Sequence, residues 1–211
     1  MTTHLQILDP DHPQRAGLLG TLREVYGAAF DAQPGSLHDR LLSLRDDSGG
    51  TLGLIGASCA ADHEKLFVEQ YLDEPVERIW SRRLGRRVAR AEIVEVGNLA
   101  ARRTGFGPWL VTALAQHLCS QRRPFTVFAA TASLRAFFEH LGVTLHDHGA
   151  ADPARLDHDA ACWGRYYESD PRVCSLDARE LLPAGEALCR RRPQLAPVLA
   201  DARSDSSRRS A

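Results

Sequence analysis

Residues 91–118 read AEIVEVGNLAARRTGFGPWLVTALAQHL, and three local structures follow one another in this stretch. Residues 91–99 are rich in β-branched side chains and alternate with a period of two, which predicts a strand. Gly97 interrupts the alternation and indicates a bulge or a close backbone approach. The glycine-rich turn ARRTGFG then leads into a helix with Pro108 in its first turn, a position that suits proline.

A second unit of the same kind follows the first. Residues 125–130 predict a strand, and residues 133–141 predict a helix with one apolar stripe, which Gly142 ends. Residues 143–146 predict the next strand. Upstream, we expect a helix at 14–30, a strand at 51–59 after a hairpin turn at 46–50, and a helix at 76–84. This order of elements predicts an α/β fold with a mixed sheet.

The composition is that of an ordinary globular protein. The chain has 211 residues, 44% of them hydrophobic and 25% charged, and a chain of this size can bury a core without disulfides or metals. Its 26 basic and 27 acidic residues give a formal net charge of -1, so a dedicated nucleic-acid-binding protein is not expected. We expect one domain over residues 1–180 and a C-terminal extension over 181–211, whose polar end we expect to be disordered.

Targeting signals and cysteine pairs are not apparent in the sequence. The opening residues contain no basic segment followed by an apolar one, as a signal peptide would. The longest weakly polar run, residues 51–61, is far shorter than the roughly 20 residues that span a bilayer. The five cysteines are scattered and include no C-x-x-C pair, which argues against a disulfide framework and a zinc site. We therefore expect a cytoplasmic protein with no stable membrane insertion.

The turn between the predicted strand and helix is a candidate anion-binding loop. Its residues are Arg102, Arg103, Thr104, Gly105, Phe106 and Gly107. A glycine-rich turn at a helix start exposes backbone N–H groups at the positive end of the helix dipole, which suits a phosphate or pyrophosphate. The two arginines strengthen this interpretation, because guanidinium groups bind phosphate well. The alternative is an ordinary tight connection whose glycines adopt positive φ.

Glu95 and Asn98 are candidate catalytic residues on the predicted strand. Their side chains would point to opposite faces of a regular strand, but a one-residue bulge at Gly97 would bring them to one face. The β-branched neighbours of Glu95 favour its burial, which would raise the pKa of its carboxyl toward that of a general base. Asn98 could orient a carbonyl or an amine. The alternative for Glu95 is a solvated carboxylate on an edge strand.

A polar strip inside FVEQYLD, residues 67–73, is a candidate for recognition of a second substrate. Glu69, Tyr71 and Asp73 would share one face if this segment were extended. Capping of the next helix by Asp73 is an equally simple account. The sequence leaves both interpretations open.

Two further groups contain chemically useful residue types. The run HDH at residues 146–148, with His158 nearby, has poor spacing for a closed metal site, so we expect a solvated turn and no metal. Tyr166 and Tyr167 lie in an aromatic patch with Trp163, and either tyrosine could donate a proton. Such a patch is more often packing than a site.

These motifs together resemble a known superfamily and, more closely, one family. The pattern R-x-x-G-x-G at residues 102–107, after a bulged strand, resembles the pyrophosphate-binding loop of the GNAT acyltransferases. The segments LFVEQYLDEPVE, EIVEVGNLA, AATASLRAFFEHLGV, HDHGAADPARL and WGRYYESDPRV together resemble the thermostable hemolysin family, over residues 15–176. EIVEVGNLA with the following helix is also similar, more distantly, to the GNAT-like acyl-homoserine-lactone synthases.

The resemblance implies a GNAT-like fold, with a mixed and mostly antiparallel sheet, flanking helices and a central strand bulged at Gly97. Splayed strands around Gly97 and residues 129–131 would admit a phosphopantetheine arm. The acyl donor would be an acyl-CoA or the acyl-phosphopantetheine of an acyl carrier protein, with its phosphates on the amides of residues 103–107. Backbone N–H groups from Gly97 to Leu99 would polarise the thioester carbonyl. The other residues that we expect at the donor are Thr131 and Arg135.

One position departs from the GNAT pattern. Many GNAT enzymes have a tyrosine four residues before the glycine that ends this helix, where it protonates the departing thiolate, and this chain has Phe138 there. The proton would then come from water, Tyr166 or Tyr167, or the sulfur would leave as a free thiolate. A thiolate is a tolerable leaving group near neutral pH.

The sequence therefore predicts an N-acyltransferase that transfers an acyl group from a CoA or carrier-protein thioester to the amine of a small molecule or amino acid. Glu95 would accept the ammonium proton, and Asn98 would position the nucleophile or the thioester carbonyl. Alternatives are an autoinducer-synthase-like enzyme with an S-adenosylmethionine-type acceptor, and a non-catalytic or membrane-active protein. A dock for an acidic carrier, or else a solvated face, could be formed by Arg82, Arg83, Arg86, Arg87, Arg102 and Arg103.

Overall fold

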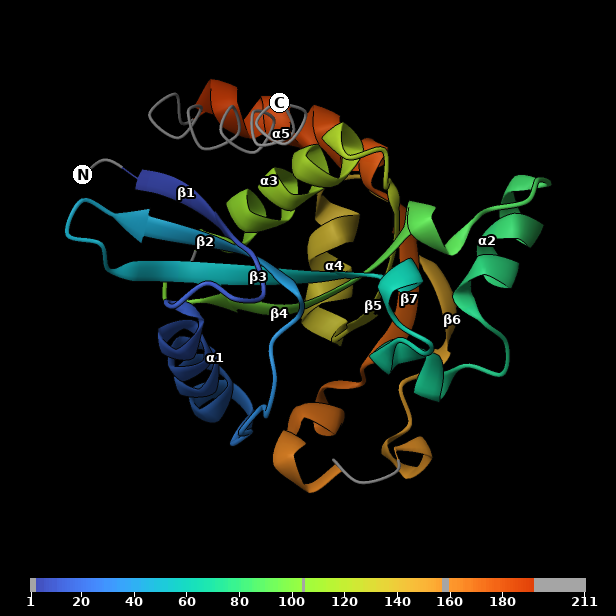
Figure 1. Ribbon diagram of the computed structural model, residues 1–211, viewed down its shortest axis with the longest axis horizontal. Helices are drawn as coiled ribbons and strands as arrows, with labels where there is room; N and C mark the ends of the chain where they lie inside the picture. Colours follow the sequence, from blue (N-terminus) through green and yellow to red (C-terminus); the bar gives the residue numbers. More distant parts are fainter. Residues whose placement is uncertain (1–2, 104, 157–159, 192–211) are drawn as a thin grey trace.

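One seven-stranded sheet organises the chain in the computed structural model, which describes residues 3–103, 105–156 and 160–191 (Figure 1). The strands are β1 (Thr3–Leu8), β2 (Arg40–Asp46), β3 (Thr51–Cys59), β4 (Ile93–Ala101), β5 (Phe125–Ala130), β6 (His146–Ala150) and β7 (Arg172–Asp177). Their order in the sheet is β1-β2-β3-β4-β5-β7-β6. Neighbouring strands are antiparallel except β4 and β5, which run parallel in the middle of the sheet.

Helices cover both faces of the sheet. They are α1 (Arg15–Phe30), α2 (Val76–Leu84), α3 (Gly107–Ser120), α4 (Ala132–His140) and α5 (Leu182–Arg191). Figure 1 shows α3 and α5 on one side of the strands and α1 on the other. Successive side chains of a strand point to opposite faces, and accordingly Leu41 packs with α1 while Leu42 packs with α3.

The helix α3 lies at the centre of the larger core. Every residue from Trp109 to Leu118 is buried, because the sheet covers one side of α3 and α5 covers the other. Leu188 and Cys189 of α5 belong to the same apolar cluster. Residues 182–191 thus pack against the domain. The residues of the expected disordered tail, 192–211, lie outside the described part of the chain.

Much of this architecture agrees with the sequence. The strands Thr51–Cys59 and Phe125–Ala130 and the helix Val76–Leu84 have the expected bounds. The mixed, mostly antiparallel sheet flanked by helices confirms the expected fold class. Among the described residues, no helix is long and apolar enough to cross a membrane.

The bulge lies directly after Gly97. Gly97 pairs with Gly56 of β3, and Ala100 pairs with Leu54, so two residues of β4, Asn98 and Leu99, oppose one residue of β3. Asn98 has a φ of 50°, and asparagine tolerates this left-handed conformation better than most residues. The expected bulge is therefore confirmed, and the positive-φ residue is Asn98, the residue after Gly97.

The two central strands separate at this bulge. β4 and β5 pair only from Ile93–Phe125 to Glu95–Val127, although β4 continues to Ala101 and β5 to Ala130. Beyond Glu95 the backbone of β4 has no strand partner on the β5 side. We call this opening the split. It is the splayed pair of strands that the resemblance implied.

Three local expectations differ from the structure. The strand expected at 143–146 begins at His146, because the N–H of Val143 still donates to Phe138 O in the turn that ends α4. The run at 146–148 is thus part of strand β6, not a solvated turn. Residues 67–71 form a 3-10 helix instead of an extended segment, so alternate residues there do not share a face.

Candidate active site

Residues of β4 at the split line two cavities. The first, which we call the split cavity, has a volume of about 330 Å³ and a mostly apolar lining. Val96, Gly97 and Leu99 of β4 face it, together with Ala129 of β5. It extends from there between α3 and α4, where Leu114, Leu134, Phe137 and Phe138 line it, and reaches Tyr26 and Tyr166 at its other end.

The second cavity, which we call the Glu95 cavity, has a volume of about 410 Å³ and is more polar. Its lining includes Glu95, Asn98, Ser58, His63, Lys65 and Trp163, with the loop 34–39. Glu95 and Asn98 therefore face one cavity, as the bulge predicted. Gly97, between them in the chain, lines the split cavity, so residues of the bulged part of β4 line both cavities.

Glu95 is a buried carboxyl on a central strand. Its side chain is 3% exposed, which excludes a solvated edge carboxylate. Its two oxygens accept hydrogen bonds from the backbone N–H of Phe67 at 2.8 Å and of Val68 at 3.0 Å. Burial raises the pKa of Glu95 to about 8, although these two hydrogen bonds act against the shift. A carboxyl with this pKa exchanges its proton near neutral pH.

Asn98 holds a loop in place. Its Oδ1 accepts the backbone N–H of His38 at 2.7 Å, and its Nδ2 lies 3.5 Å from Ser36 O. The left-handed conformation of the bulge turns the amide toward loop 34–39. Asn98 thus shapes one wall of the Glu95 cavity.

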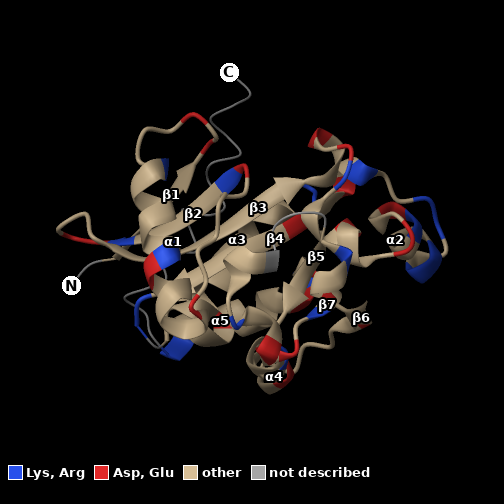
Figure 2. Ribbon diagram, turned by 90° about the horizontal axis from the view of Figure 1, so that it is seen from below, with Lys and Arg blue, Asp and Glu red and all other residues tan. Residues whose placement is uncertain are grey.

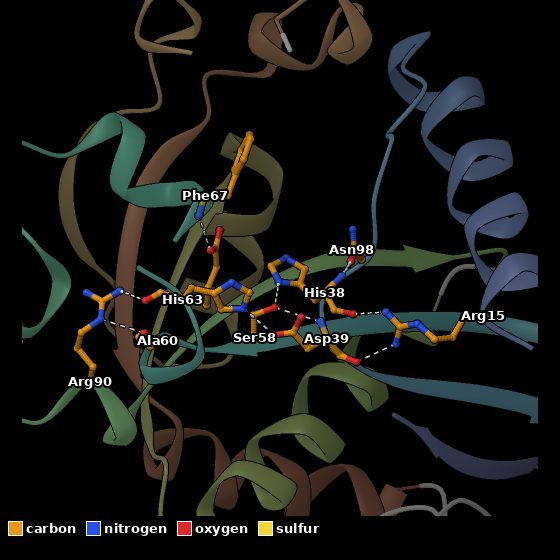
Figure 3. Close-up of polar contacts among 10 residues, drawn as sticks. Arg15, His38, Asp39, Ser58, Ala60, His63, Phe67, Arg90 and Asn98 are labelled. Carbon is orange, nitrogen blue, oxygen red and sulfur yellow. Dashed lines mark hydrogen bonds and ion pairs between the residues drawn. The ribbon is translucent and has the colours of Figure 1, made fainter. Parts of the chain in front are cut away.

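A cluster that the sequence did not indicate lines the same cavity and includes residues of the loop that Asn98 holds (Figure 3). His38 Nδ1 lies 3.0 Å from Ser58 Oγ, which also accepts the N–H of Asp39 at 3.1 Å. His63 Nε2 lies 2.6 Å from Asp39 Oδ2. A usable sequence signal for this cluster was Gly56 in strand 51–59, because a glycine within a strand marks a place where another group approaches the backbone closely.

The proposed acceptor strip does not form a strip in the structure. Glu69 is buried and binds the backbone N–H of Leu66 and Val76 and the guanidinium of Arg90. Burial alone would raise the pKa of Glu69, but Arg90 and these N–H groups hold it below its ordinary value. Tyr71 Oη is 2.7 Å from Tyr167 Oη, in the interior.

Asp73, the third residue of that strip, is exposed and pairs with Arg155 at 2.7 Å. The N-cap residue of α2 is Pro75, which offers no capping side chain, and Glu69 accepts the N–H of Val76 at this helix start. Asp73 therefore belongs neither to a recognition strip nor to a helix cap in this structure.

The candidate anion loop has the expected position between β4 and α3. Gly105 has a φ of 96°, and α3 begins two residues later. Arg102 is exposed and pairs with Glu24 at 2.5 Å, while Arg103 is exposed. Thr104 is outside the described residues. The first-turn N–H groups of a helix have no acceptor within the helix, so those of Gly107 and Trp109 are suited to an anion.

The remaining predicted residues lie on the far side of the split. Thr131 caps α4 by accepting the N–H of Leu134, and it lines the split cavity. Arg135 donates to Ala130 O and to Asp170, so it fastens α4 to the segment before β7 and does not line the split cavity. Tyr166 Oη lies 3.5 Å from Ala129 O, and burial raises its pKa, which keeps its proton in place.

Four of the six arginines of the possible carrier dock have acidic partners. The pairs are Arg82–Glu74, Arg83–Glu180, Arg86–Glu92 and Arg102–Glu24. Figure 2 accordingly shows basic and acidic segments next to each other around α2. Pairing reduces the positive field that would attract an acidic protein. The carrier dock stays a prediction without support from this charge pattern.

No metal centre is evident in the described residues, where no group of three or more His, Cys, Asp or Glu side chains is placed to hold a metal ion. His148 of the HDH run contacts Ser175 Oγ at 2.8 Å, and His158 is outside the described residues. All five cysteines are free thiols.

Comparisons with known proteins agree with this geometry. A family model described as thermostable hemolysin matches residues 8–181. BjaI, a CoA-dependent acyl-homoserine lactone synthase solved with SAM and isopentyl-CoA, is similar with a TM-score of 0.59 and 11% identity over 95% of this chain and 98% of that chain. TofI, solved in a ternary complex with an inhibitor and MTA, has a TM-score of 0.57 and 18% identity over 90% of this chain and 100% of that chain.

A third similar structure is FeeM, an N-acyl amino acid synthase from uncultured soil microbes, with a TM-score of 0.52 and 14% identity over 85% of this chain and 94% of that chain. No curated protein matches the chain. These likenesses confirm the expected fold-level resemblance to acyl-homoserine-lactone synthases. At such low identity they establish the fold, and the reaction has to be argued from the site.

Proposed function

The chain belongs to the thermostable hemolysin family, and we propose that it is an N-acyltransferase. It would transfer an acyl group from a thioester donor, an acyl-CoA or the acyl-phosphopantetheine of a carrier protein, to the amine of a small molecule or amino acid. One observation carries this proposal: a buried carboxyl, Glu95, lies at the point where two parallel central strands separate, on a strand whose residues line two cavities. One cavity suits an apolar chain and the other suits a polar amine.

The split suits the donor. An open strand edge offers N–H and C=O groups to an extended ligand, and the phosphopantetheine arm is extended and contains amides. The apolar wall formed by Leu114, Leu134 and Phe137 would hold the acyl chain. The amides at residues 103–107, at the start of α3, would bind the phosphates. N–H groups of the bulge, from Gly97 to Leu99, would face the thioester carbonyl.

Glu95 suits the role of general base. A base works best when its pKa is near the operating pH, and the value of about 8 is close to that of an α-amino group, about 8. In its ionised form Glu95 would take a proton from the acceptor ammonium, directly or through one water. Asn98 would position the loop that holds the acceptor. Tyr166 retains its proton and lies at the split, so it would protonate the leaving sulfur in place of the absent tyrosine at Phe138.

The direct test is a turnover screen. Acyl-CoAs of several chain lengths are incubated with the protein and either the common amino acids or S-adenosylmethionine, thiol release is followed, and products are identified by mass spectrometry. An N-acyl product that requires the protein supports the proposal. A lack of product with every pair, together with dye release from lipid vesicles, would instead support a membrane-active protein.

An autoinducer-synthase-like reaction is the second candidate. Its support is the similarity in fold to BjaI and TofI over most of both chains. In the same screen it predicts methylthioadenosine and an acyl lactone from S-adenosylmethionine. An N-acyl amino acid from a free amino acid would favour the first candidate.

Substitution of Gly105 by Asp is expected to abolish donor binding. The new residue would have to adopt a φ of 96°, and its charge would lie where we place the donor phosphates. Acyl-CoA at about 100 times its Kd should stabilise the wild type by about 2.7 kcal/mol, and this should vanish in the variant. The measurement is a thermal-shift titration.

Gly85→Asp is the matched control for that titration. Gly85 also has a positive φ, 62°, but it ends α2, away from the proposed donor loop. The Gly85→Asp variant should be less stable than wild type, but acyl-CoA should still raise its Tm. An undiminished response in Gly105→Asp would remove the loop from the donor site.

Substitution of Leu134 by Trp is expected to shorten the acyl chain that the protein prefers. Leu134 lines the split cavity from α4, and an indole there would occupy space proposed for the chain. Each methylene that loses its place costs about 0.8 kcal/mol, roughly fourfold in affinity. The measurement is KM across acyl-CoAs of increasing length, with Leu84→Trp on the exposed side of α2 as control. An unchanged length preference would place the chain elsewhere.

A further inference from the structure

A notch in the sheet beside the split holds the side chain of His38. Gly56 and Gly97 are partners on β3 and β4, and both strands lack a side chain at this position. A Cβ on Gly56 would lie 2.8 Å from His38 Cβ, and a Cβ on Gly97 would lie 2.3 Å from His38 Nε2. Both distances are shorter than real contacts allow. The two glycines therefore leave room for one imidazole, whose Nε2 lies against the bulged strand.

The backbone of His38 is fixed from two sides (Figure 3). Its N–H donates to Asn98 Oδ1 at 2.7 Å, and its carbonyl accepts from Arg15 Nη2 at 2.5 Å. Arg15 also binds the carbonyl of Asp39 at 2.8 Å. A loop residue held by both the bulge and α1 presents its ring in a constant position, as a preorganised catalytic group requires.

The hydrogen bonds of Ser58 favour one tautomer of His38, in which the Ser58 hydroxyl has an acceptor for its own proton. Ser58 Oγ accepts the N–H of Asp39, because a backbone N–H can only donate. The hydroxyl proton of Ser58 then has His38 Nδ1, at 3.0 Å, as its acceptor. An imidazole that accepts at Nδ1 is neutral and carries its proton on Nε2. The donor N–H therefore lies on the ring atom closest to Gly97.

The surroundings keep this imidazole neutral. Burial lowers the pKa of His38 to about 4; the charge of Asp39 acts in the opposite direction, and His63 and Arg15 add to the lowering. Glu95, Lys65 and Cys162 are the other titratable groups that line the same cavity. A neutral imidazole that does not ionise near pH 7 is a poor base but a good hydrogen-bond donor, as in enzymes that polarise a carbonyl with a neutral histidine.

We propose that His38 is a further catalytic residue, whose Nε2–H binds the thioester carbonyl oxygen as it becomes an oxyanion. This inference rests on the proposed acyl transfer. Gly97 carries the argument, because it lines the split cavity while His38 Nε2 lies next to the position of its absent side chain. We therefore place the thioester carbonyl at the bulge, between the strand N–H groups and the imidazole.

The step balances without a co-reactant. Glu95 takes one proton from the acceptor ammonium, and the amine lone pair forms the C–N bond while the C=O electron pair moves onto oxygen. His38 donates a hydrogen bond to that oxygen and keeps its proton. The C=O bond re-forms as the C–S bond breaks. The nitrogen then loses a second proton and the leaving sulfur takes up one, so these two protons cancel. The products are therefore the amide, the thiol and the one proton taken by Glu95.

The test compares two variants of His38. Asparagine retains a polar group near the Nδ1 position and lacks one at Nε2, whereas glutamine places an amide N–H near the Nε2 position. With the best acyl-CoA and amine from the turnover screen, His38→Asn is expected to lower kcat by about 10²–10³, the usual effect of losing one oxyanion donor. KM for acyl-CoA should not change, and His38→Gln should recover about tenfold or more of the loss.

The outcomes separate this inference from the proposed function. If the wild type shows no turnover, the acyl transfer and the role of His38 both fail. If the wild type turns over and His38→Asn has the same kcat, only the role of His38 fails. His140→Asn on the exposed end of α4 is the matched control and should behave as wild type.

A measurement without turnover tests the same inference. In the ¹⁵N–¹H spectrum of the imidazoles, His38 is expected to be neutral with its proton on Nε2 from pH 5.5 to 8, values well above its pKa of about 4. Ser58→Ala should shift the proton toward Nδ1. A wild-type ring that carries its proton on Nδ1, or that is charged at pH 7, overturns the proposal.

Discussion

Substitution of Glu95 by Gln is expected to lower kcat by about 10²–10⁴, the range for a general base. The amide has nearly the same size but cannot accept the ammonium proton. Its Oε1 can still accept one of the two N–H groups, from Phe67 or Val68, so the local structure should largely persist. The measurement is kcat with the acyl-CoA and amine of the turnover screen, and Glu139→Gln on exposed α4 is the control.

The pH profile identifies the reason for this loss. The wild-type rate should rise with pH through about 8, because only the ionised carboxylate accepts a proton. In Glu95→Gln this limb should be absent. A variant with a rate near wild type, or one that keeps the limb near pH 8, would show that another group removes the proton.

Glu95 should also affect stability as the pH changes. Its folded pKa, about 8, lies above its ordinary value, so the folded state binds this proton more tightly than the unfolded state. The resulting stability is fully present below the ordinary pKa and is lost as the pH rises through about 8. Between pH 6 and 9 the wild-type Tm should therefore fall more than that of Glu95→Gln. Parallel curves would mean that the carboxyl is already ionised at pH 6.

Glu95 could be found from the sequence because its signal is local. A carboxylate among Ile93, Val94 and Val96 on a strand, followed by a glycine, has few ordinary explanations. The same holds for the turn 102–107, whose position between strand and helix follows from its neighbours. Strand β4, the bulge and the helix α3 were predicted for this reason.

His38 could not be found in this way, because its position depends on long-range pairing. The residue lies about 60 positions from Asn98 and Gly97, and only the register Gly56–Gly97 creates the notch for its ring. Strands β1 and β7 were missed for a related reason. Segments such as THLQIL and RVCSLD are short, and tertiary pairing makes them strands.

The strip at Glu69 was misinterpreted because the local structure was wrong. A period of two places residues 69, 71 and 73 on one face, but the segment is a 3-10 helix over Phe67–Tyr71. Glu69 therefore points toward Arg90, and the N–H groups of Phe67 and Val68 point toward Glu95. The segment holds the carboxyl of Glu95 through these N–H groups and does not form the expected extended strip.

Substitution of Arg90 by Met is therefore expected to destabilise the fold by about 3–5 kcal/mol, the usual cost of leaving a buried charge without its partner. Arg90 binds both oxygens of Glu69, at 2.9 and 3.0 Å, and Glu77 at 2.8 Å. Glu69 is 5% exposed, so water cannot replace the guanidinium. The measurement is denaturant unfolding at pH 7. Arg86→Met, which breaks an exposed pair with Glu92, should cost less than about 1 kcal/mol.

The pH dependence of stability shows whether Glu69 supports the fold or binds the acceptor. The folded pKa of Glu69 lies below its ordinary value, so its contribution is present above that value and is lost as the pH falls. The difference in the free energy of unfolding between wild type and Arg90→Met should therefore be smaller at pH 4, where the unpaired carboxylate of Glu69 can be protonated. Arg90→Met/Glu69→Gln should recover part of the loss at pH 7, because it removes the unpaired charge. If Arg90→Met is as stable as wild type while Glu69→Gln raises KM for the amine, Glu69 recognises the acceptor after all, and the segment 67–71 has to open for it to do so.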